Sequence, residues 1–247
     1  MSTSSGWLKH CLVILDKNMQ SVAQKLGEVR EKLIETAWRS GREPDEITLV
    51  VVSKVHSVRK IQEAIDVGQT VFGENYLQEA LKKVAVLPHH IKWHLVGPLQ
   101  GNKIRKALDL FSLIHSVHSL ALARNIDNIA GEQRVTPRIL LEVNVSGETS
   151  KFGFAPQALE SCIEELLALP NVQIEGLMTV TPYASDPEDS RAFFMQLRAL
   201  RERLVQQTGM PLGSLSMGMS GDYQVAIEEG ATLIRVGSAI FGERCSY

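Results

Sequence analysis

The sequence predicts a closed barrel of eight parallel strands alternating with helices, the (β/α)8 or TIM barrel, preceded by one additional helix. Short apolar segments alternate with amphipathic segments from residue 47 to residue 242. Such strict alternation is typical of a parallel sheet with right-handed crossovers. Eight repeats in a chain of 247 residues match the usual size of this barrel. The composition, 44% hydrophobic and 22% charged, is that of an ordinary globular protein.

The additional helix is predicted over residues 18–40, where apolar residues recur at spacings of three and four. This pattern is formed by Val22, Leu26, Val29, Leu33 and Ala37. Gly41 ends the helix, and a turn containing Pro44 leads into the first strand. We expect residues 1–17 to be an extension and residues 18–247 to be one barrel domain, because no linker or change in composition divides them.

The predicted strands are short, and the first, "ITLVVVS" (47–53), is apolar on both faces, as a strand buried in a parallel sheet should be. The eight strands occupy residues 47–53, 70–75, 91–97, 111–117, 137–146, 172–180, 213–220 and 232–242. The helices between them occupy residues 57–68, 76–86, 102–109, 119–130, 156–169, 187–208 and 222–230. An open doubly wound sheet is the alternative, but it would favour a GxGxxG fingerprint after the first strand, where the chain reads "SKVHSV".

Charge and cysteine usage argue against several classes of function. The net charge of −2 disfavours nonspecific binding to nucleic acid or to anionic membranes. Three widely spaced cysteines without a CxxC pair form neither a disulfide framework nor a zinc site, so we expect no metal and a reducing, cytoplasmic location. No apolar stretch approaches the roughly 20 residues of a membrane span.

Glycine and serine follow the last two predicted strands, in "SMGMSGD" and "RVGSAIFG". Barrels often bind phosphate in the loops after their seventh and eighth strands. Gly221 and Gly237 would let the backbone approach an anion, and the Ser220 and Ser238 hydroxyls would donate to it. Each pair alone could be an ordinary turn, but together they favour a phosphate site.

Lys54 directly follows the first predicted strand. A lysine condenses with an aldehyde only when its amine is neutral, and burial at a strand end would lower its pKa from about 10.4. The alternative is a lysine whose amine reaches water at the barrel mouth. A reactive lysine and a phosphate site together point to pyridoxal 5′-phosphate (PLP), which carries an aldehyde and a phosphate.

Arg235 lies two residues before Gly237, so both side-chain positions face the barrel interior. A guanidinium facing the pyridine nitrogen of PLP can donate a hydrogen bond but does not give up its proton. The ring would then be a weaker electron sink than one facing a carboxylic acid. The alternative is an arginine paired with a core carboxylate such as Glu142.

Several motifs carry a resemblance to a known family. They are "VVSK" (51–54), "FGENYLQE" (72–79), "WHLVGPLQGNK" (93–103), "IHSV" (114–117), "LLEVNVSGETSKFGF" (140–154), "GLMT" (176–179) and "LSMGMSGDYQVAIEEGATLIRVGSAIFG" (215–242). From about residue 20 to the C-terminus the sequence resembles the pyridoxal phosphate homeostasis proteins, which share a barrel with alanine racemase.

The resemblance implies a PLP barrel of fold type III, with Lys54 holding the cofactor as an internal aldimine. It also implies roles for six other residues, with Ser220, Gly237 and Ser238 at the phosphate, Arg235 at the ring nitrogen, and Asn75 and His94 lining the ring pocket.

Two main functions compete. A PLP-dependent racemase needs acid–base groups on both faces of the substrate, and in racemases with this barrel the second base comes from an additional domain, which we expect to be absent here. A carrier would hold PLP for cytoplasmic homeostasis and transfer it, with PLP-dependent apoenzymes as possible acceptors, and we expect this function, as a monomer and without catalysis. A barrel enzyme acting on another phosphorylated substrate is a third possibility.

Overall fold

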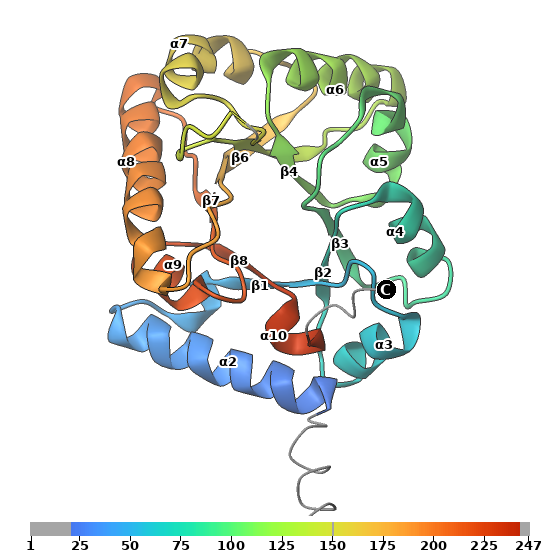
Figure 1. The fold of residues 1–247 in the computed structure, drawn as a ribbon. Coiled ribbons are helices and arrows are strands. Elements are labelled where there is room, and N and C mark those ends of the chain that lie inside the picture. The colour runs from blue at the N-terminus through green and yellow to red at the C-terminus, as the bar shows by residue number, and fades with distance from the viewer. Residues whose placement is uncertain (1–20, 150, 243–247) are drawn as a thin grey trace, which may run out of the picture.

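The computed structural model describes residues 21–149 and 151–242, and it contains a closed barrel of eight parallel strands. The strands follow one another around the ring in chain order, and β8 closes the barrel against β1 (Figure 1). Their bounds are β1 Thr48–Val52, β2 Val71–Glu74, β3 Lys92–Leu95, β4 Leu113–Val117, β5 Arg138–Glu142, β6 Gln173–Met178, β7 Ser214–Ser216 and β8 Leu233–Val236. The predicted fold class is confirmed. The expected extension at residues 1–17 lies outside the described residues.

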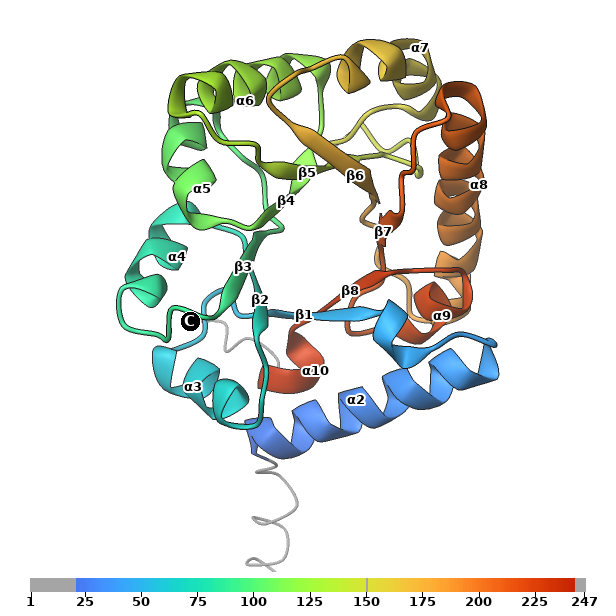
Figure 2. The ribbon, with the colours of Figure 1, turned by 180° about the vertical axis from the view of Figure 1, so that it is seen from behind.

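Helices surround the ring of strands, and Figure 2 shows the same arrangement from behind. The α-helices are α2 Val22–Arg39, α3 Val58–Asp66, α4 Leu77–Val84, α5 Ile104–Leu110, α6 Leu120–Gln133, α7 Pro156–Leu167, α8 Arg191–Thr208, α9 Tyr223–Glu228 and α10 Ser238–Phe241. Short 3-10 helices occupy Pro44–Glu46, Gly101–Lys103 and Pro187–Ser190.

The last predicted strand, residues 232–242, is wrong in its second half. β8 ends at Val236, and the next residues form the single-turn helix α10, with Ile240 and Phe241 buried. Both segments are apolar, and periodicity does not separate a buried strand from a buried helix in so short a run.

Helix α2 completes the outer layer of the barrel. It begins with a capping box between Ser21 and Gln24 and buries the predicted apolar face. It packs against α3, α9 and α10, and in Figure 1 it runs beside β1 and β8. Because α10 is only four residues long, α2 covers the wall that a full helix after β8 would otherwise cover.

The apolar core has two parts. The larger part lies between the strands and the helices, and the smaller part fills the barrel interior. The interior part consists of Val50, Leu113, Leu140, Met178 and Leu233. Closer to the carboxyl ends of the strands the interior becomes polar, and this is where barrels of this kind place their functional sites.

None of the helices between residues 21 and 242 has the length and apolar character that crossing a membrane requires.

Candidate cofactor site

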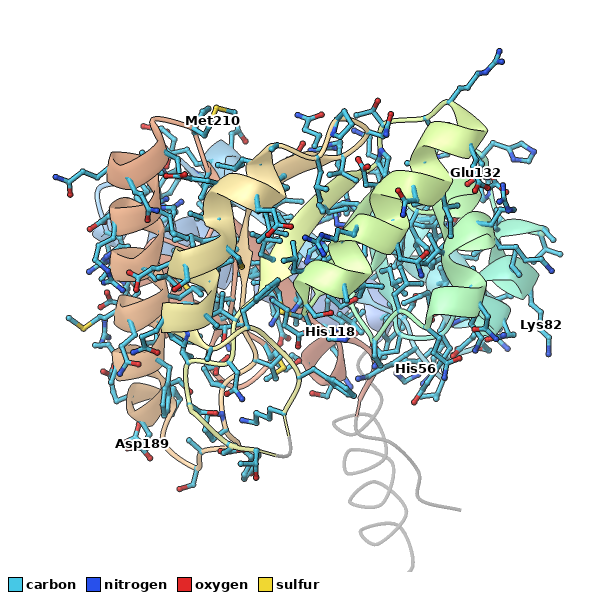
Figure 3. The ribbon with its side chains drawn as sticks, turned by 90° about the horizontal axis from the view of Figure 1, so that it is seen from above. His56, Lys82, His118, Glu132, Asp189 and Met210 are labelled. Atoms are coloured by element: carbon cyan, nitrogen blue, oxygen red, sulfur yellow. The ribbon has the colours of Figure 1, made fainter. Side chains whose placement is uncertain are left out.

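A cavity of about 450 Å³ opens among the loops that follow the carboxyl ends of the strands. Six of the seven predicted residues line it: Lys54, Asn75, Ser220, Arg235, Gly237 and Ser238. This volume is within the usual range for small-molecule sites. Figure 3 shows the edge that carries these loops, with His56, His118 and Asp189 along it and with Met210 and Glu132 at the opposite edge.

Lys54 is half-buried and lies where β1 gives way to its loop. Its strand neighbour Val52 lines the same cavity, as alternation along a strand requires. Gly237 lies across from Val52, and a Cβ atom at position 237 would be 3.1 Å from the Val52 carbonyl oxygen. A larger residue at 237 would therefore push the loop after β8 away from β1, and with it one wall of the cavity.

The loops after β7 and β8 form a wall of the cavity that carries two serine hydroxyls, those of Ser220 and Ser238. The backbone N–H groups of Gly237 and Ala239 donate to Ser220 Oγ at 3.1 and 3.2 Å, so the serine links the loops after β7 and β8. Since its oxygen accepts from two amides, the Ser220 hydroxyl hydrogen can be donated into the cavity. The two amides thus orient the Ser220 hydroxyl, and the hydroxyls of Ser220 and Ser238 are neutral donors that suit a phosphate.

Gly218 shapes the same wall, although the sequence pattern did not single it out. Its φ of +89° is in the region that favours glycine, and a Cβ atom there would lie 2.5 Å from the Cβ atom of Ala226. Its carbonyl oxygen accepts from the backbone N–H of Arg235 at 3.0 Å. The sequence does not show which of the two glycines in "SMGMSGD" has a positive φ, so only the structure identifies this one.

Arg235 lines the cavity from the barrel interior and is buried. Its guanidinium donates to Ser216 Oγ at 2.6 Å and to the Thr179 carbonyl oxygen at 2.8 Å. Burial lowers the pKa of Arg235 to about 10, while the charges of Asp222 and Glu142 oppose the shift, so the group is a cation at neutral pH. Within the part of the chain that the structure describes, no carboxylate lies within 4.0 Å of this guanidinium, so the alternative of a direct pair with Glu142 is wrong.

His94, the seventh predicted residue, is not among the residues that line the cavity. It is buried, and its Nδ1 lies 3.0 Å from Nε2 of His115. His115 Nδ1 in turn lies 2.8 Å from Ser216 Oγ, which accepts from Arg235. We call these four residues, Arg235, Ser216, His115 and His94, the inner chain. His94 is thus connected to the cavity through three other residues.

Both histidines of the inner chain are neutral at pH 7. Burial lowers the pKa of His94 to about 4, with smaller contributions from the charges of Arg138 and Lys92. Burial also lowers the pKa of His115 well below its ordinary value, and His94 and Arg235 add to this effect. A neutral imidazole has one donor and one acceptor nitrogen. The contacts fit one arrangement, in which Arg235 donates to Ser216 Oγ, Ser216 to His115 Nδ1, and His115 Nε2 to His94 Nδ1.

Comparison with known proteins is consistent with this geometry. The family described as "Alanine racemase, N-terminal domain" matches residues 28–245. The chain is 41% identical to the pyridoxal phosphate homeostasis protein of Aquifex aeolicus (strain VF5) over 91% of its own length and 99% of the relative. The chain belongs to the pyridoxal phosphate homeostasis protein family. The resemblance predicted from the motifs is therefore confirmed.

Solved structures share the barrel fold of this chain at different degrees of sequence identity. PipY of Synechococcus elongatus PCC7942, solved with PLP bound, is 39% identical and has a TM-score of 0.79, covering 90% of this chain and 100% of that one. An alanine racemase of Clostridium difficile 630 is 14% identical with a TM-score of 0.69, covering 88% of this chain and 60% of that one. The second similarity shows a shared fold alone.

The structure of this homeostasis family member also adds residues that sequence reasoning missed. The segment after β6 contributes Pro182, Tyr183 and Pro187 to the cavity. His56 lines it as well, with its ring centroid 4.6 Å from that of Phe241 in α10. These residues lie in irregular segments, where no periodicity shows which side chains turn inward.

Proposed function

We propose that this protein binds PLP in the cavity at the carboxyl end of its barrel and serves cellular PLP homeostasis as a carrier. The observation that carries the proposal is one cavity lined both by Lys54 and by the hydroxyl donors Ser220 and Ser238, with Ser220 oriented by two amides. These two chemistries suit the aldehyde and the phosphate of one cofactor. The structure of PipY with PLP bound, a protein 39% identical to this chain, supports the same assignment.

Each predicted residue has a role in this proposal. Ser220, Gly237 and Ser238 would bind the phosphate, Arg235 would donate to the ring nitrogen, and Asn75 would line the ring. His94 would act only through the inner chain, by helping to hold Arg235 in place. When bound, the cofactor supplies an aldehyde. Lys54 would hold this aldehyde end covalently through its side-chain amine, as the Schiff-base lysine of the site.

The absence of catalysis is part of the proposal. Arg235 is a cation held by Ser216 and Thr179, so it can donate to a ring nitrogen without protonating it. An unprotonated ring accepts electrons poorly, which disfavours the carbanion that a racemase must form. The relatives that this chain spans almost completely are named for homeostasis, which also supports a carrier.

We further propose that the protein is a single-domain cytoplasmic monomer and that it transfers PLP to apoenzymes. Light scattering of the purified protein tests whether it is a monomer.

The test is a visible absorbance spectrum before and after addition of PLP, followed by borohydride reduction and peptide mass measurement. We expect a visible band, and we expect the trapped mass on the peptide that contains Lys54. Lys54→Ala should lose the band and the trapped adduct, because no amine remains at that wall. Trapping on another residue would contradict the assignment of Lys54, and amino-acid turnover at ordinary enzyme rates would contradict the carrier.

A further inference from the structure

A cluster of buried charges lies behind Lys54, on the helix side of the barrel wall. Glu74 at the end of β2 and Lys83 in α4 are buried, at 0% and 4% exposure. Lys83 Nζ donates to Glu74 Oε1 and to Glu79 Oε1, each at 2.6 Å. The Ser53 hydroxyl donates to the same Glu74 oxygen at 2.5 Å. We call Ser53, Glu74, Glu79 and Lys83 the outer cluster.

The outer cluster holds the backbone on both sides of Lys54. On the N-terminal side, Lys83 Nζ donates to the Ser53 carbonyl oxygen at 2.7 Å. On the C-terminal side, the Val55 N–H donates to Glu79 Oε1 at 2.6 Å. Since Lys83 also contacts both glutamates, one ammonium group connects the two flanks. Ser53 faces the helices and Lys54 the cavity, as alternation at a strand end requires.

Val55 shows why this segment needs external support. Its φ of +62° is in the left-handed region, which is unfavourable for a β-branched residue. Its side chain is 61% exposed, so packing does little to hold the conformation. The backbone of Val55 is held by α4, because its N–H donates to the Glu79 side chain of that helix. Strained residues of this kind persist where the surrounding structure imposes them, and they concentrate at functional sites.

The chemistry of the outer cluster is costly for a purely structural role. Burial raises the pKa of Glu74, although the bonds from Lys83 and Ser53 oppose this shift. The second oxygen of Glu74 is buried, and among residues 21–149 and 151–242 it has no hydrogen-bond partner. Apolar side chains would often fill such a position with equal or greater stability. A buried ion pair does, however, impose directional contacts on the backbone it binds, which apolar packing does not.

We propose that Glu79, Glu74 and Lys83 are positioning residues that set the place of the Lys54 amine relative to the phosphate end of the cavity. The proposal rests on the proposed function. It assigns the outer cluster to the covalent part of PLP retention and leaves phosphate binding to the loops after β7 and β8. Loosening the cluster should therefore weaken a ligand that bonds to Lys54 and spare a ligand that binds only through its phosphate and ring.

The test compares PLP with pyridoxamine 5′-phosphate, which has the same ring and phosphate but no aldehyde. In Glu79→Ala we expect the Kd for PLP to rise about tenfold, equivalent to about 1.4 kcal/mol, and the Kd for pyridoxamine 5′-phosphate to change less than about twofold. Glu79→Gln keeps an oxygen that can accept from Val55 and should restore most of the PLP affinity. Glu63→Ala removes a surface ion pair with Arg59 on α3 and serves as the matched control.

The outcomes separate this inference from the proposed function. A wild-type protein that binds neither compound overturns both. If the wild type binds both compounds and Glu79→Ala weakens the binding of both equally, or of neither, only the positioning role is overturned. If Glu79→Ala does not fold, Ser53→Ala provides the second test, because it removes only the hydroxyl bond to Glu74. Its Kd for PLP should rise about threefold, while its Kd for pyridoxamine 5′-phosphate should stay nearly unchanged.

Discussion

Two polar groups lie on opposite sides of the barrel wall near the candidate site, and they are built from different chemistry. The inner chain joins one cation, Arg235, to neutral partners that end at His94. The outer cluster joins a lysine to two glutamates at direct contact distance. The inner chain thus depends on hydrogen bonds between mostly neutral groups, whereas the outer cluster depends on charge compensation.

The difference follows from what each group contacts. The inner chain has no carboxylate in direct contact among its described neighbours, so burial keeps its histidines neutral rather than charged. The outer cluster brings its counter-charges from β2 and α4, where Lys83 reaches Glu74 and Glu79 together. Removing a partner should therefore cost more in the outer cluster, where a buried charge would be left uncompensated.

The largest expected effect comes from Lys83→Met, which removes the ammonium that both glutamates share. Breaking a buried pair in this way typically lowers the free energy of unfolding by about 3–5 kcal/mol. Urea denaturation of both proteins measures the difference. Lys82→Met is the matched control on the same helix, because Lys82 is exposed and projects away from the barrel in Figure 3. We expect that control to change stability by less than about 0.5 kcal/mol.

Equal losses in the two methionine variants would show that the outer cluster contributes no more than a surface charge. Charge compensation in the outer cluster would then add nothing to the free energy of unfolding. A Lys83→Met variant that regains stability when combined with Glu74→Gln would instead support it, since the second change removes the uncompensated carboxylate.

Sequence reasoning predicted the barrel because alternating apolar segments are local features of the chain. It also placed Lys54 at the cavity, because this residue directly follows the first strand, and Arg235, because parity along the last strand puts it on the same face as Gly237. It did not predict the outer cluster. Alternation shows that Glu74 and Asn75 face opposite sides, but not that Glu74 faces a lysine of α4.

His94 shows the same limit from the inner side. Its strand position correctly predicts an inward side chain, but depth along the barrel axis depends on how the strands are staggered. The structure places it against His115 rather than at the cavity. Contacts between side chains from β3, β4, β7 and β8 arise only once the barrel closes, so no single segment of sequence encodes them.

The next largest effect is a pH dependence of the free energy of unfolding that arises from His94 in the inner chain. The pKa of His94 is about 4 in the folded protein, against an ordinary value of 6.5. The unfolded chain therefore binds the proton more readily, and stability is lost as the pH falls from 6.5 toward 4. The shift corresponds to about 3 kcal/mol over this window. Urea denaturation at several pH values should show a shallower acid loss in His94→Gln than in the wild type.

The control is His89, because its side chain is exposed at the surface and belongs to neither the inner chain nor the outer cluster. His89→Gln should follow the wild-type curve throughout. If His94→Gln lost as much stability at low pH as the wild type, protonation of other groups would cause the loss. Keeping His94 neutral would then not determine the pH dependence of stability.

The smallest of these effects is expected for Ser216→Ala, which interrupts the inner chain at its centre. Ser216 accepts from Arg235 and contacts His115, so its loss leaves two buried polar groups each lacking one partner. This should cost about 1–3 kcal/mol of unfolding free energy, measured in urea. Ser214→Ala on the same strand is the control. Arg235 keeps its bond to the Thr179 carbonyl oxygen, so it should remain at the cavity and PLP affinity should fall less than stability. A loss of PLP affinity larger than the loss of stability would show instead that Ser216, rather than Thr179, holds the guanidinium in place.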